Sequence, residues 1–90
     1  MKHDTKLTEL ARKAQVQLIR RQNLEQCEKH VVLGEQHVLR QREIVDRLDR
    51  SGLDASWARD LLKTFERLQL MLIEHRDYFR DELAAITSRP

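Results

Sequence analysis

The sequence predicts an all-α fold, a long antiparallel helical hairpin. Only three of its 90 residues are glycine or proline, and the single proline, Pro90, stands at the end. So few turn-forming residues argue against a sheet and favour long helices. Apolar residues also recur at spacings of three and four on both sides of one turn signal, which is typical of packed helices.

The turn signal is Ser51-Gly52-Leu53-Asp54. Gly52 can adopt a positive φ and end a helix with a left-handed cap. Asp54 or Ser56 can then begin the next helix, because their side-chain oxygens accept hydrogen bonds from the free N–H groups of a first turn. We therefore expect one helical segment to end at residue 50 and another to begin at residue 56.

These signals divide a single helical domain, residues 1–90, into four parts. They are a basic N-terminal helical extension at 1–23, a first hairpin helix at 24–50, a turn at 51–55 and a second hairpin helix at 56–86. The pattern in 1–23 is weak, so this part continues the first helix, folds back or is disordered.

Each hairpin helix carries one apolar stripe. The first consists of Val31, Gly34, Val38, Gln41, Val45 and Leu48; the second consists of Ala58, Leu61, Leu62, Phe65, Leu68, Leu72, Phe79, Leu83 and Ile86, with His75 in line. A short turn makes the helices antiparallel. We expect Gln41 opposite Phe65, Gly34 opposite Leu72, and Val31 opposite His75.

Two stripes make a thin core, and other apolar residues need a cover. We expect a second copy to supply it, giving a homodimeric four-helix bundle of coiled-coil type. The alternative is a three-helix bundle in which the N-terminal segment folds back. The predicted interface residues are Val38, Val45, Leu48, Leu61, Phe65, Leu68, Leu72 and Phe79.

Polar residues interrupt the first stripe and form a predicted polar seam of Gly34, His37 and Gln41. A glycine inside a helix costs about 1 kcal/mol relative to alanine. Gly34 is therefore either a point of close approach to a neighbouring helix or a tolerated defect. Gln41 either forms a buried polar layer that fixes register or extends to water at the edge of the seam.

Catalysis and metal binding are not expected. Cys27-x-x-His30 places a thiol and an imidazole on one side of a helix, with His75 across the seam, but the spacing is generic for zinc. These three residues are the only metal candidates, and we predict neither a metal nor a cofactor. The chain has no nucleophile motif and no phosphate-binding loop, so we predict that it is not an enzyme.

Charge suggests a second class of partner. The formal net charge is only +2, but residues 1–23 carry six basic and two acidic residues, a net of +4. A basic patch of Arg12, Lys13, Arg20 and Arg21 could contact phosphates. Because no nucleic-acid-binding motif accompanies the patch, we do not expect nucleic acid as the main partner.

Location follows from the same composition. Cys27 is the only cysteine, which fits a reducing compartment. The N-terminal residues are too charged for a signal peptide, and no apolar run could span a membrane. We expect a cytoplasmic protein without membrane contact.

Residues Leu24 to Leu83 carry Gly34-Glu35-x-His37, Gln41-Arg42, Val45-x-x-Leu48, Gly52, Ala58-x-x-Leu61-Leu62-x-x-Phe65-Glu66 and His75. This pattern resembles small bacterial proteins, common in alphaproteobacteria, that have no assigned function. The resemblance implies a helical hairpin and carries over no catalytic residue.

The predicted function is a non-catalytic protein–protein interaction or scaffold module that self-associates through its apolar seam. One alternative is a nucleic-acid accessory protein that uses the basic N-terminal segment. The other is a small regulator with a metal or pH input through its histidines.

Overall fold

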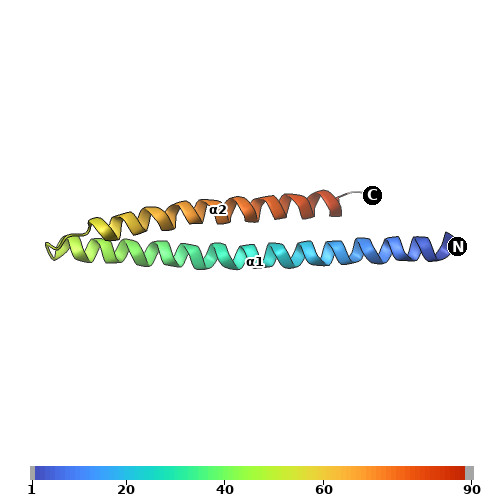
Figure 1. Cartoon of the computed structure of the whole chain (residues 1–90), viewed down its shortest axis with the longest axis horizontal. Helices are drawn as coiled ribbons and strands as arrows, with labels where there is room; N and C mark the ends of the chain where they lie inside the picture. Colours follow the sequence, from blue (N-terminus) through green and yellow to red (C-terminus); the bar gives the residue numbers. More distant parts are fainter. Residues whose placement is uncertain (1, 89–90) are drawn as a thin grey trace.

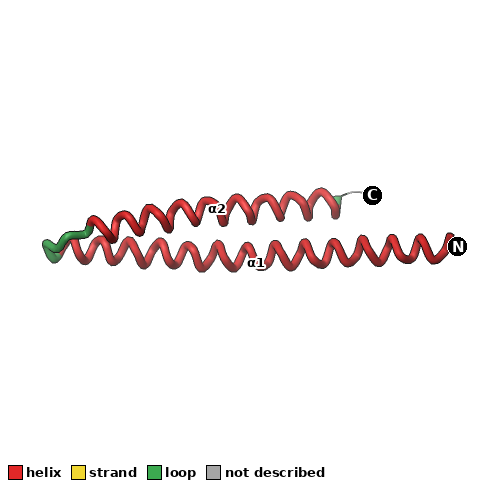
Figure 2. The backbone as a smooth tube through the Cα atoms, viewed as in Figure 1, coloured by secondary structure: helices red, strands yellow, loops and turns green. Residues whose placement is uncertain are grey.

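The chain folds into two long helices joined by a tight turn (Figure 1). This computed structural model describes residues 2–88, so the predicted domain limits, residues 1 and 90, lie outside the described residues. Helix α1 spans Lys2–Arg50 and helix α2 spans Ser56–Thr87. The helices run side by side as a rod of 76 × 17 × 14 Å, and the described part contains helix and loop but no strand (Figure 2). The predicted all-α hairpin is confirmed.

Helix α1 is continuous across the N-terminal segment. Its residues are mostly good helix formers, and no glycine or proline precedes Gly34. The alternative three-helix bundle is therefore wrong, because residues 2–23 extend α1 rather than fold back. The N-terminal end of α1 projects beyond the end of α2 (Figure 1), and every side chain from Thr5 to Val16 is exposed.

The turn has the predicted glycine cap. Gly52 has a φ of 69°, in the left-handed region. The Leu53 N–H donates to the Leu48 carbonyl at 2.9 Å, and the Gly52 N–H donates to the Asp49 carbonyl at 3.2 Å. These two bonds form a Schellman motif, which satisfies carbonyls that the end of α1 would otherwise leave free.

Helix α2 begins at Ser56, directly after Ala55. The methyl side chain of Ala55 cannot accept a hydrogen bond, so it cannot cap the helix. No side chain caps α2 from the N-cap position, so the predicted cap takes a different form, in which Asp54 bonds the first residue of the helix from one position further upstream. Its Oδ1 atom accepts hydrogen bonds from the Ser56 N–H at 3.0 Å and from the Ser56 hydroxyl at 2.6 Å. One carboxylate therefore fixes the direction in which the chain enters α2.

The two helices meet along a seam with strict alternation of three and four residues. Its members are buried or half-buried: Leu24, Cys27, Val31, Gly34, Val38, Gln41, Val45 and Leu48 on α1, Ala55 at the end of the turn, and Ala58, Leu62, Phe65, Gln69, Leu72, Arg76, Phe79, Leu83 and Ile86 on α2. This is the packing of an antiparallel coiled coil. The predicted stripe on α1 is confirmed without change.

The predicted stripe on α2 needs two corrections. Gln69 and Arg76 occupy the seam where the sequence suggested Leu68 and His75, because strict alternation from Phe65 leads to them. Leu61 and Leu68 flank the seam and stay 38% and 48% exposed.

The register differs from the prediction by about one helical turn at two points. The Gln41 Nε2 atom donates to the Ala58 carbonyl at 3.0 Å, so Gln41 lies closer to Ala58 than to the Phe65 level. The Val31 carbonyl accepts from Gln69 at 2.8 Å, where His75 was expected. At Gly34 the nearest side chain is that of Gln69, and Leu72, the predicted neighbour, lies beside it.

Within the described residues, neither helix has an apolar stretch of the length that a bilayer crossing requires.

Candidate interaction surface

Both helices contribute to two opposite sides of the rod, and ion pairs occupy one of these sides. Asp49 pairs with Arg59 at 2.5 Å, and two further pairs follow at intervals of seven and then fourteen residues along both helices: Arg42–Glu66 at 4.0 Å and Glu28–Arg80 at 3.7 Å. We call this side the ladder face. Such exposed pairs each contribute only about 0.2–1 kcal/mol, so their main effect is to keep this face charged and hydrated.

The opposite side is mostly uncharged. Each central residue of this side comes two positions after a residue of the ladder face, or after its equivalent seven residues along. Two positions along a helix rotate the side chain by about 200°, which brings it to the opposite side. They are Asn23, His30, His37 and Ile44 on α1, and Leu61, Leu68, His75 and Glu82 on α2. Large side chains at neighbouring heptad positions widen this surface: Leu33, Trp57, Met71 and Tyr78. We call these twelve residues together the apolar face.

Much of the apolar face is open to solvent. Leu33 is 50% exposed, Met71 52%, Tyr78 59% and Trp57 60%. Large apolar side chains exposed along one side of a small protein are a candidate interaction site, although polar residues such as His37 and His75 lie among them.

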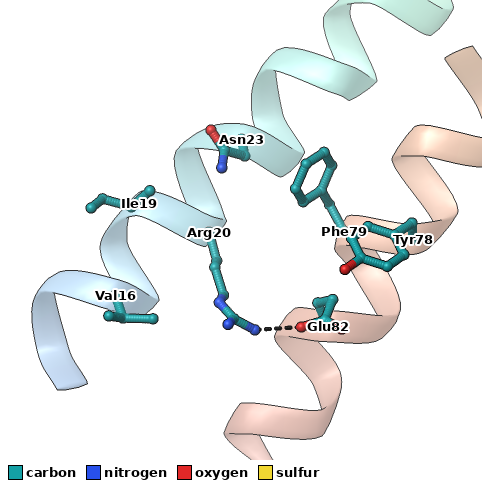
Figure 3. Close-up of a pocket in the computed structure, with 7 residues that line it drawn as sticks. All are labelled: Val16, Ile19, Arg20, Asn23, Tyr78, Phe79 and Glu82. Atoms are coloured by element: carbon teal, nitrogen blue, oxygen red, sulfur yellow. Dashed lines mark hydrogen bonds and ion pairs between the residues drawn. The ribbon is translucent and has the colours of Figure 1, made fainter.

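An open groove ends the apolar face at the far end from the turn. Val16, Ile19, Arg20 and Asn23 line it from α1, and Tyr78, Phe79 and Glu82 line it from α2 (Figure 3). Arg20 and Glu82 form an ion pair of 2.5 Å across its floor. The Tyr78 and Phe79 rings meet edge to face at 5.5 Å, so one wall of the groove is aromatic.

The predicted polar seam divides into two environments. Gln41 is 4% exposed and bonded to a backbone carbonyl, so the buried-layer interpretation of Gln41 is the correct one. His37 instead lies outside the seam on the apolar face. Its ring is exposed and tilts against Phe65 with 6.1 Å between ring centroids.

Gly34 is a point of close approach, not a tolerated defect. A Cβ atom at this position would overlap the Gln69 amide oxygen and lie 3.2 Å from Leu72 Cδ1. The Gln69 side chain therefore fits only because residue 34 has no side chain. Its oxygen is buried without a hydrogen-bond partner, while its nitrogen donates to Val31.

The metal candidates do not converge. Over the described residues, no group of three His, Cys, Asp or Glu side chains is placed to hold a metal ion. Cys27 is half-buried in the seam, and the His30 ring lies 3.3 Å from the Gln26 amide nitrogen.

The predicted basic patch has one member that is paired within the hairpin. Arg12, Lys13 and Arg21 are exposed on α1, but Arg20 turns toward α2 and pairs with Glu82. One of its four charges is therefore already neutralised within the hairpin.

The sequence prediction missed three residues: Gln69, Arg76 and Trp57. Gln69 and Arg76 could have been found by extending the strict alternation of three and four from Phe65, without requiring each position to be apolar. Trp57, Met71 and Tyr78 are separated by multiples of seven residues, so they lie on the same side of α2. This periodicity could have revealed the apolar face in the sequence.

Comparison with known proteins found no match: no family model fits the sequence, and no curated protein or solved structure is similar to the chain. The resemblance to small alphaproteobacterial hairpin proteins stays a prediction.

Proposed function

We propose that this chain is a non-catalytic protein–protein interaction module that self-associates through its helical hairpin. The imbalance of burial carries the proposal. Among the described residues, only five apolar side chains are buried, all of them valine or alanine, whereas fifteen large apolar side chains are exposed. Burying apolar surface is the main driving force of association, and a second copy is the commonest way to bury it.

Phe65 and Leu72 support this proposal from within the hairpin. Both are half-buried between the helices, although they are among the largest apolar side chains of the seam. A second hairpin would cover their exposed sides and complete a core of bundle thickness.

The test is the mass in solution, measured by light scattering over a range of micromolar concentrations. We expect a species of twice the chain mass of 10.8 kDa. A mass that stays at 10.8 kDa at every concentration would contradict self-association.

A further inference from the structure

The pattern of the two helices indicates how a second copy would pack. Helices that form only a two-stranded seam need apolar residues at two of every seven positions, whereas bundle helices carry a third on one flank. Here α2 carries that third position on one flank as Leu61 and Leu68, and α1 carries it on the same flank as Ile44, next to the polar His30 and His37; on the other flank the equivalent apolar residue is Ile73. The other flank holds the ion pairs of the ladder face. The side open to another hairpin is therefore the apolar face.

The apolar face is large enough for a stable dimer. The 32 residues of α2 extend about 48 Å at 1.5 Å per residue, and the rod is 17 Å wide. The face thus covers about 800 Å² per copy, which is the area that a standard protein–protein interface buries on each partner.

The two ends of the apolar face complement each other. Trp57 precedes Arg59 by two residues and lies level with the last turn of α1, because Arg59 pairs with Asp49. The groove at Val16 to Asn23 lies about 40 Å further along α1 at 1.5 Å per residue. Leu33 lies about halfway between these two features. A two-fold axis near Leu33 would place Trp57 of each copy over the groove of the other.

Charge favours the same arrangement. The charged residues at the heptad positions of this side are Arg40 and Arg47, which border the apolar face in the half near the turn, and Glu82, which already pairs with Arg20, in the other half. Antiparallel hairpins bring the arginines of one copy toward the half of the partner that holds Glu82. Parallel hairpins would place the arginine halves side by side, where like charges repel.

From these observations we infer that a second copy of this chain packs on the apolar face, antiparallel to the first, with Trp57 of each copy in the groove that Tyr78 and Phe79 border. This inference rests on the proposed self-association and adds the face, the orientation and the anchoring side chain. It places large aromatic residues at both ends of the interface, where they contribute large buried area.

The face is tested with a matched pair of variants, Leu33→Glu and Leu39→Glu. Both leucines lie on α1 and both are 50% exposed, but Leu39 shares a groove with the ladder residues Arg42 and Glu66. Leu33→Glu would place two carboxylates near the two-fold axis, so we expect its mass to fall to that of one chain. Leu39→Glu should keep the mass of the dimer. A second pair, Met71→Glu and Leu70→Glu, repeats the comparison on α2 if the first pair folds poorly by circular dichroism.

The orientation is tested by cross-linking in a Cys27→Ser background. Chains with Trp57→Cys are mixed with chains that carry Asn23→Cys, a residue of the groove, and treated with a short bismaleimide. Antiparallel packing should join unlike chains and leave each variant alone largely uncross-linked. Cross-linking of Trp57→Cys chains to themselves would show parallel packing and overturn the orientation.

The outcomes separate the two proposals. A single-chain mass for the unchanged protein contradicts the proposed function. A dimer that survives both Leu33→Glu and Met71→Glu, or that is broken equally by the Leu39→Glu control, overturns only the assignment of the face.

Discussion

At the scale of single residues, the seam depends on one residue without a side chain, which makes room for a polar side chain. Gly34 leaves the space that the Gln69 amide fills, and this position lets the Gln69 Nε2 atom reach the Val31 carbonyl at 2.8 Å. A net contribution of about 1 kcal/mol is typical of such a hydrogen bond. This is similar to the helix propensity that glycine forfeits.

The two effects predict strong coupling between Gly34→Ala and Gln69→Ala. In the unchanged protein, Gly34→Ala gains helix propensity but displaces Gln69 and presses on Leu72, so we expect no gain in stability. With Gln69 already replaced by alanine, only the end of the Leu72 side chain has to shift, and Gly34→Ala should stabilise the protein by up to about 1 kcal/mol. Urea unfolding of the four proteins at one chain concentration measures the coupling. Additive effects of the two substitutions would contradict the proposed fit.

At the scale of the elements, the turn depends on the backbone of Gly52. Its φ of 69° is unfavourable for residues with a Cβ atom, yet no heavy atom lies within 4 Å of where that Cβ would be. Gly52→Ala should therefore lower stability by about 1 kcal/mol through the backbone alone. Gly52→Asn should cost less, because asparagine tolerates this conformation better. Equal losses for the two variants in urea unfolding would point to a steric cause instead.

The start of α2 gives the hairpin a dependence on acid. Hydrogen bonds from the Ser56 hydroxyl and N–H, with a smaller effect of Arg59, hold the pKa of Asp54 below its ordinary value of 3.8. The charged form is therefore favoured in the folded state, and its contribution is complete above pH 3.8. That contribution is lost as the pH falls through the lowered pKa.

This sign predicts how Asp54→Asn behaves. The variant should be less stable than the unchanged protein at neutral pH, and the difference should shrink below about pH 4, where Asp54 itself becomes protonated. Thermal unfolding of both proteins between pH 2.5 and 7 measures it. A difference that is constant over this range would show that the charge of Asp54 does not support the helix start.

The elements were predictable because their signals are local. Gly52 and Asp54 mark the turn by chemistry that depends on a few neighbouring residues: Gly52 ends α1 as predicted, and Asp54 bonds Ser56 at the start of α2, although it is not the N-cap. The register was harder, since it depends on contacts between residues far apart in the sequence. Gln69 contributes one of these contacts through its long amide side chain. Because the side chain is polar, a search for apolar residues did not place Gln69 in the seam.

At the scale of the whole molecule, the apolar periodicity of the sequence predicted the hairpin but did not show which side of it is charged and which is apolar. The predicted interface mixed seam residues such as Val38 with flank residues such as Leu61, because at 100° per residue the two classes lie close together on a helical projection. Only the ion pairs of the ladder face showed which flank is charged. The course of residues 2–23 was likewise open in the sequence, since a continued helix and a folded-back one use the same helix-forming residues.

The projecting end of α1 gives a last prediction about the molecule. Side chains from Thr5 to Val16 are exposed, and a helical end without tertiary packing contributes little to stability. Deleting residues 1–15 should therefore leave the melting temperature and the dimer mass nearly unchanged, with helicity reduced in proportion to the length removed. Deleting residues 76–90, a segment of equal length, is the control. It removes Phe79 and Leu83 from the seam and Glu82 from its pair with Arg20, so circular dichroism should show a much lower melting temperature. Equal losses from both deletions would mean that residues 1–15 pack against the hairpin, as in the three-helix arrangement that the continuous α1 argues against.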